Sequence, residues 1–144
     1  MLNLAESQEE FARQVINNVL APFGFSKVTP EPGQYSDFDF RGLKNGKESK
    51  IEFKQRTYTS NHFDSWFIRK SKVERIGPPF IYVNLYKDDV ARLWVVTEDL
   101  LSNTNSGKIT IPNQTTPGPN RHMHRREVYF LDPSDAYTYA PELP

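Results

Sequence analysis

Apolar residues recur three and four positions apart across residues 7–20, which is the spacing of one face of an amphipathic helix. Ser7 and Glu10 form a capping box immediately before this stripe. We therefore expect a helix over residues 7–20, ended by the proline and the glycine that follow it, and then a short strand over residues 25–28.

The clearest pattern in the chain is a strict alternation of apolar and polar residues on both sides of Asn45-Gly46. This dipeptide between alternating segments predicts a β-hairpin with a two-residue turn, in which Lys44 faces Lys47. The register of the whole pair follows from that turn. On the face that points to the core, two apolar pairs are expected, Phe40 with Ile51 and Phe38 with Phe53.

The other face of this hairpin carries charged residues. In the same register Asp39 faces Glu52, and Asp37 faces Lys54. Directly opposed residues have Cβ atoms roughly 4.5–5.5 Å apart, so two carboxylates placed in this way repel each other unless a cation lies between them. A hard cation such as Mg²⁺ takes oxygen ligands of this kind. The face therefore indicates a divalent-metal site, and the structural alternative is a solvated face with a cross-strand ion pair.

Downstream of the hairpin, the pattern predicts further elements. Residues 66–76 mix aromatic, aliphatic and basic side chains and suit a basic helix that lies on the domain. Residues 80–86 are a nearly continuous run of β-formers, typical of a central strand buried on both faces, and residues 92–96 are expected to pair with it. Thr97 then caps a short helix that runs through residue 101.

The C-terminal part is richer in polar residues. Residues 102–126 contain many Asn, Thr, Pro and Gly, so we expect a long irregular excursion with a brief strand at Ile109 and Ile111. Residues 128–131 return as a strand at an edge of the sheet, and residues 132–144 form an extended or disordered tail. Together the elements predict an α/β fold with a central mixed β-sheet of about five strands flanked by helices.

Composition narrows the classes of function. The length of 144 residues suits a single domain, residues 1–144. The chain contains no cysteine, which excludes disulfides, thiolate nucleophiles and cysteine-ligated zinc. No window is long and apolar enough for a membrane span and no secretory signal is evident, so we expect a soluble cytoplasmic protein. Because the formal net charge is +0, a nucleic-acid partner must be met by a local basic surface.

Asp39, followed after the hairpin by Glu52-Phe53-Lys54, resembles the signature of the PD-(D/E)XK nuclease superfamily, which includes many restriction endonucleases and Holliday-junction resolvases. The proline of that signature is absent here. The resemblance implies a restriction-endonuclease-like fold and cleavage of DNA that depends on Mg²⁺ or Mn²⁺. It also implies that Asp39 and Glu52 are metal ligands, that the Phe53 carbonyl is a third ligand, and that Lys54 is catalytic.

Three further residues follow from the resemblance. A Ser-Asp arrangement favours Asp37 as the metal ligand, whereas the hairpin register favours Asp39, which we prefer. Some members of the superfamily use an acid on the first helix, for which Glu10 is the candidate here, although its capping role explains it equally well. Some also use a Ser-Lys pair on the following helix, and Lys72 is the matching residue.

Basic residues suited to contact nucleic-acid phosphates lie near the predicted metal centre or in a basic segment towards the C-terminus, and they are Arg56, Lys70, Arg121, Arg125 and Arg126. A domain this small has little surface with which to grip a duplex, so we expect a homodimer. Two alternatives to a DNA endonuclease remain. One is a catalytically inactive nucleic-acid-binding or protein-interaction module on the same fold, and the other is an RNA-cleaving enzyme.

Overall fold

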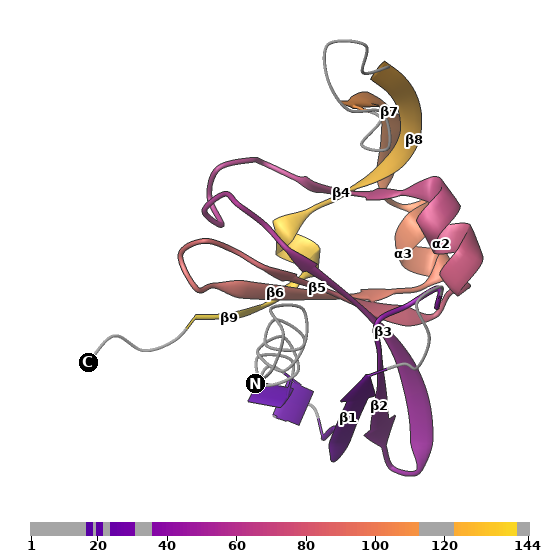
Figure 1. Ribbon diagram of the computed structural model, residues 1–144, viewed down its shortest axis with the longest axis vertical. Helices are drawn as coiled ribbons and strands as arrows, with labels where there is room; N and C mark the ends of the chain where they lie inside the picture. The colour runs from indigo at the N-terminus through magenta and orange to yellow at the C-terminus, as the bar shows by residue number, and fades with distance from the viewer. Residues whose placement is uncertain (1–16, 19, 22–23, 31–35, 113–122, 141–144) are drawn as a thin grey trace, which may run out of the picture.

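Six strands form the central sheet of the protein in the computed structural model (Figure 1). Their order is β1-β2-β3-β5-β6-β9; β3 and β5 are parallel, and the other neighbours are antiparallel. The bounds are Lys27–Pro30 for β1, Phe40–Lys44 for β2, Lys47–Gln55 for β3, Phe80–Leu85 for β5, Ala91–Val96 for β6 and Tyr137–Tyr139 for β9. The structure describes residues 17–18, 20–21, 24–30, 36–112 and 123–140.

The beginning of the chain agrees in part with the prediction. Residues 17, 18 and 20 are helical, and the remainder of the predicted helix over residues 7–20 lies outside the described residues. The first strand begins at Lys27 and pairs with β2, so it lies two residues later than predicted.

The hairpin at Asn45-Gly46 has the predicted register. Lys44 faces Lys47, and the pairing continues residue by residue as far as Phe40. The φ angles of Asn45 and Gly46 are 51° and 76°, and a type I′ turn requires positive φ at both central positions. The turn chemistry therefore determines which side chains of β2 and β3 share a face.

The ladder between β2 and β3 ends where Phe40 faces Ile51. The three pairings predicted beyond it are therefore wrong, and they are Asp39 with Glu52, Phe38 with Phe53 and Asp37 with Lys54. The N–H of Asp39 still donates to the Ile51 carbonyl at 3.1 Å, but the preceding backbone bends away. The physical reason is local, because the Asp39 carboxylate accepts the hydrogen bond of the Phe53 N–H at 3.0 Å and takes the place of a backbone acceptor. Phe38 consequently packs with the hydrophobic cluster on the other face of the sheet from Phe40.

Residues 66–76 do not form one helix. Residues Trp66–Arg69 are a strand, β4, and the helix α2 covers Lys70–Ile76 only. Trp66 and Ile68 are buried with strand spacing, whereas Val73 and Ile76 are buried with helical spacing. The prediction merged two short elements whose periods differ.

A second sheet of three strands has the order β4-β8-β7, with β7 at Asn105–Pro112 and β8 at Met123–Leu131. Figure 1 shows the β7–β8 hairpin extending beyond the rest of the molecule. The prediction of an irregular excursion over residues 102–126 is therefore wrong for most of its described part, and β8 is a central strand, not an edge. The brief strand predicted at Ile109 and Ile111 lies within β7. The rest of this strand could not be predicted from an apolar pattern, because no side chain described in β7 is buried.

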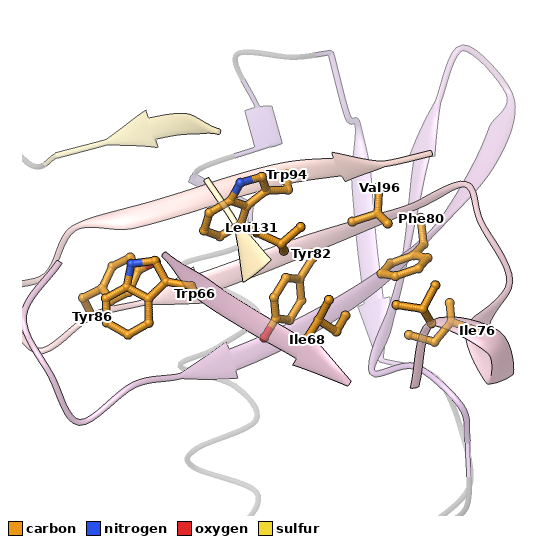
Figure 2. Close-up of a cluster of buried hydrophobic side chains, with 10 residues drawn as sticks. Trp66, Ile68, Ile76, Phe80, Tyr82, Tyr86, Trp94, Val96 and Leu131 are labelled. Atoms are coloured by element: carbon orange, nitrogen blue, oxygen red, sulfur yellow. The ribbon is translucent and has the colours of Figure 1, made fainter. Parts of the chain in front are cut away.

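The strand β5 is buried along its whole length, as predicted, because both faces of the central sheet are covered. On one face, Leu20 packs with residues of β2, β3, β5 and β6. On the other, β4, α2 and the end of β8 cover β5 and β6, and Figure 2 shows Trp66, Ile68 and Leu131 among the labelled side chains around Tyr82 and Trp94.

The remaining elements close the sheet. Strand β6 pairs with β5 as predicted, and the Thr97 hydroxyl caps α3 (Glu98–Ser102) by accepting from the Leu100 N–H at 3.1 Å. The described part of the tail contains a 3₁₀ turn at Pro133–Asp135 and strand β9, which pairs with β6. The tail is therefore partly built into the central sheet. Residues 141–144 lie outside the described residues.

The predicted fold class, α/β with a central mixed sheet, is confirmed, with six strands in that sheet. Along the chain, the described elements run from a three-strand meander, β1 to β3, through β4 and α2 to β5, which is parallel to β3. Within the described residues, no helix is both long enough and apolar enough to cross a membrane.

Candidate active site

The structure brings the carboxyl groups of Asp39 and Glu52 together. Asp39 lies in the bend before β2, where its Oδ2 is held at 3.0 Å by the Phe53 N–H. Glu52 lies on β3, next to that N–H in the chain. The Asp39 carboxylate raises the pKa of Glu52, both by its charge and by a hydrogen bond that needs the Glu52 proton. Two carboxyl groups this close compete for one proton.

Glu52 is the more deeply buried of the two acids, with a side chain that is 13% exposed. Burial is the largest reason that the pKa of Glu52 rises from 4.5 to about 7, and the charge of Asp39 is the second. Lys72 acts in the opposite direction, because its Nζ lies 3.2 Å from Glu52 Oε2. The other oxygen, Oε1, is buried and has no hydrogen-bond partner among the residues that the structure describes.

Lys54 projects from β3 on the same face as Glu52, two residues later. Its side chain is exposed as a whole, yet partial desolvation lowers the pKa of the ammonium, and the positive charges of Arg56 and Arg69 lower it further. Glu52 and Asp39 raise the same pKa by smaller amounts. A lysine with a lowered pKa loses its proton more readily than a free lysine and can serve as a base.

The Arg56 side chain has a structural role next to Lys54. Its guanidinium donates to the Asn84 side-chain oxygen and, at 3.0 Å each, to the Phe67 carbonyl and the Tyr82 hydroxyl. Three bonds to protein acceptors tie this predicted phosphate contact to the interior. Its contact with nucleic acid stays a prediction, and the structure gives it a second role in lowering the pKa of Lys54.

A cavity of about 370 Å³ opens in front of Glu52. One acid and five cations line it, and the cations are Lys54, Arg56, Arg69, Lys72 and Arg75. Sequence reasoning did not select Arg69 and Arg75 as site residues. The signal was their spacing, because Arg69, Lys72 and Arg75 recur every three residues and therefore share one face where β4 passes into α2.

The other predicted site residues lie apart from this cavity or outside the described residues. Asp37 is exposed in the bend and has no place in the ladder opposite Lys54. The Lys70 ammonium lies 5.1 Å from the centre of the Tyr129 ring, and Arg126 is exposed on β8. Arg125 lies on β8 opposite Thr110, while Glu10 and Arg121 fall among the residues that the structure does not describe.

The acids fit a divalent cation. Glu52 Oε1 is a buried carboxyl oxygen to which none of the described residues donates, and buried polar groups of this kind are rarely left unpaired. Mg²⁺ commonly uses one or two carboxylates and fills its remaining positions with other oxygens. Across the described ranges no three His, Cys, Asp or Glu side chains gather as a metal cluster. A cation would therefore be held by Asp39, Glu52 and a backbone oxygen, for which Phe53 is the predicted donor.

Comparison with solved structures finds a similarity to Hjc, a Holliday junction resolvase from the archaeal hyperthermophile Archaeoglobus fulgidus, with a TM-score of 0.46 and 12% sequence identity. The match covers 84% of this chain and 88% of the resolvase chain. No protein-family model matches the sequence, and no curated protein matches it.

Proposed function

We propose that this protein is an endonuclease that hydrolyses phosphodiester bonds of DNA with Mg²⁺ or Mn²⁺ as cofactor. One observation carries the proposal: a buried carboxylate, one oxygen of which has no hydrogen-bond partner among the described residues, lies beside a second carboxylate, and the other charged residues that line its cavity are cations. Acids that hold a metal, surrounded by side chains that hold phosphate, are the combination that phosphodiester hydrolysis needs.

The chain's own residues divide the work. Asp39, Glu52 and the Phe53 carbonyl would hold the metal. The bound metal would stabilise the negative charge that develops on the phosphate and would lower the pKa of water. Arg69 and Arg75 bind and orient the phosphates of the strand. A phosphate held in this way would lie next to Lys54, which lines the same cavity.

Lys54 acts as the general base. In its neutral form its amine accepts a proton from the attacking water, which its lowered pKa favours. The water oxygen then bonds to phosphorus, the bond from phosphorus to the leaving oxygen breaks, and the leaving oxygen takes a proton from solvent. Lys72 is paired with Glu52 in the structure. When a cation neutralises the acids, the Lys72 ammonium is released and can contact the phosphate instead.

The test is a cleavage assay on supercoiled plasmid, single-stranded DNA and branched DNA, with Mg²⁺, with Mn²⁺ and with EDTA. We expect strand cutting in either metal and none in EDTA. RNA offered in the same assay tests the RNA-cleaving alternative, which preferred cutting of RNA would establish. Binding of DNA without cutting, together with no measurable affinity for either metal, would establish the inactive module instead.

A single cavity of this size holds one scissile phosphate at a time, so two copies of the chain would let both strands of a duplex be cut in one binding event. We therefore propose a homodimer as the form that cuts duplex DNA. Sedimentation at the concentration of the cleavage assay measures this directly. A monomer that makes paired cuts would contradict the dimer and leave the chemistry of the site unaffected.

A further inference from the structure

A second cavity, of about 700 Å³, adjoins the one in front of Glu52. The two share Lys54, Arg56 and Phe67 as lining residues, so they meet at the proposed catalytic lysine. Its volume is within the range of sites that hold small organic groups. Its other walls include three aromatic side chains, Tyr58, Phe63 and Trp66, and we call it the aromatic cavity.

Two of these aromatic rings face solvent. Tyr58 and Phe63 are each 45% exposed, whereas Trp66 is buried. The rings support one another, since Tyr58 and Phe63 meet edge to face at 5.0 Å and Phe63 meets Trp66 in the same way at 5.3 Å. Figure 2 shows Trp66 in turn against Tyr86, with ring centres 4.5 Å apart. The exposed rings are thus held on a buried aromatic base.

The loop that carries Tyr58 and Phe63 is fixed to the sheet by its own hydrogen bonds. Ser60 is buried, and its N–H and hydroxyl both donate to the Asp88 carboxylate, at 3.1 and 2.7 Å. Arg92 donates to the Ser60 carbonyl at 2.7 Å. The aromatic rings are therefore presented in a fixed position, and little ordering is required when a ligand arrives.

Single exposed aromatic residues are common and need no explanation. Here the exposed rings lie together at a cavity that continues into one lined by cations. Aromatic faces next to Lys and Arg are the chemistry that binds unpaired nucleotides, because a base stacks on the rings while its phosphate meets the cations. A base inside a duplex is stacked between its neighbours and cannot enter such a cavity.

We propose that the aromatic cavity binds one unpaired nucleobase of the strand whose scissile phosphate lies at Lys54. Such a base site predicts that a DNA strand with an unpaired nucleotide next to the cut is cleaved faster than the same strand in a fully paired duplex. This inference rests on the proposed function for the position of the phosphate. The stacking itself is a binding property and can be measured without any cutting.

The test uses a DNA hairpin that carries a fluorescent adenine analogue either as a single bulged base or fully paired. Binding is followed in EDTA by fluorescence anisotropy and by quenching of the analogue, which reports stacking. Each stacked base contributes about 5-fold to 150-fold in affinity. We expect tighter binding of the bulged probe than of the paired one, and a loss of this preference with loss of quenching when Tyr58→Ala and Phe63→Ala are combined.

Matched variants separate stacking from general damage. Tyr58→Phe keeps the ring and should keep the preference for the bulged probe. Tyr139→Ala removes another exposed tyrosine, on β9, and should change neither probe. An equal loss of affinity for both probes in the double variant, or no loss for either, would overturn the proposal.

Two results tell this inference apart from the proposed function. Plasmid cutting with no preference between the probes rejects the aromatic cavity as a base site and leaves the nuclease intact. A preference for the bulged probe that the double variant abolishes, in a protein that never cuts, rejects the nuclease and supports the base site.

Discussion

Lys72 Nζ lies 3.2 Å from Oε2 of Glu52, while the other oxygen of the same carboxylate is buried with no donor in the described part of the chain. The lysine comes from α2 and the acid from β3, so the ion pair links this helix to the central sheet. An acid that is only half satisfied in this way retains affinity for a second cation. This arrangement underlies the predictions that follow.

Asp39→Asn should abolish metal-dependent cutting, whereas Asp37→Asn should leave it unchanged. The asparagine oxygen at position 39 can still accept the Phe53 N–H, so the bend and the fold should persist while the anionic ligand is lost. Asp37 is exposed outside the ladder and serves as the matched control. Plasmid cleavage and Mg²⁺ titration by calorimetry measure the two effects. Full activity in Asp39→Asn would remove this residue from the site.

Lys54→Met should lower the cleavage rate by about 10²–10⁴-fold, the usual contribution of a proton-transferring side chain. Because the Lys54 side chain is exposed, thermal unfolding should be close to that of the wild-type protein. Lys47→Met, at an exposed position near the start of the same strand, is the control and should cut normally. Single-turnover kinetics with saturating enzyme isolate the chemical step, and an unchanged rate there would contradict the role of Lys54.

The stability of the metal-free protein should fall as the pH rises from 4.5 to about 7, because Glu52 has a raised pKa in the folded state. Between these values the folded protein binds more protons than the unfolded chain, so the free energy of unfolding decreases with pH. The contribution is fully present below pH 4.5 and is lost above about 7. It amounts to about 3 kcal/mol at most.

Glu52→Gln removes this titration, so the difference in stability between the variant and the wild-type protein isolates it from other groups. Urea unfolding in EDTA at several pH values measures that difference, with the exposed Glu48→Gln as control. Mg²⁺ needs the deprotonated carboxylate, so its affinity should fall below pH 7 in the wild-type protein. A difference that does not vary with pH would refute the raised pKa.

Lys72→Met should destabilise the metal-free protein by about 1–3 kcal/mol above pH 7, because it leaves a buried carboxylate without its donor. Mg²⁺ should restore most of this loss by binding the freed acid. Thermal unfolding with and without Mg²⁺ tests both statements. Lys87 is an exposed lysine in the turn before β6, and Lys87→Met should have the stability of the wild-type protein both with and without Mg²⁺. If the two substitutions changed the stability equally, the ion pair would make no contribution to the stability of the fold.

Local chemistry determined the parts of the structure that depend on a few neighbouring residues. Asn45-Gly46 specifies a turn with positive φ at two positions, and this set the register of β2 and β3. The strand β5 and the cap at Thr97 could also be predicted. Burial on both faces requires a run of apolar residues, and an N-cap requires a side chain such as a hydroxyl that accepts a hydrogen bond. The candidate pair Asp39 and Glu52 followed from the register.

The tertiary structure decided what depends on residues far apart in the chain. The bend at Asp39 replaces three predicted ladder pairs, because its carboxylate reaches across to the Phe53 N–H. Strand β7 and its pairing with β8 left little apolar pattern, since backbone hydrogen bonds hold strands together whatever the side chains are. Lys72 meets Glu52 only because α2 packs over β3 and β5, and the aromatic cavity exists only because the Tyr58 loop is bound to the Asp88 turn. Sequence periodicity records which face of an element is buried, whereas these contacts depend on which elements the core brings together.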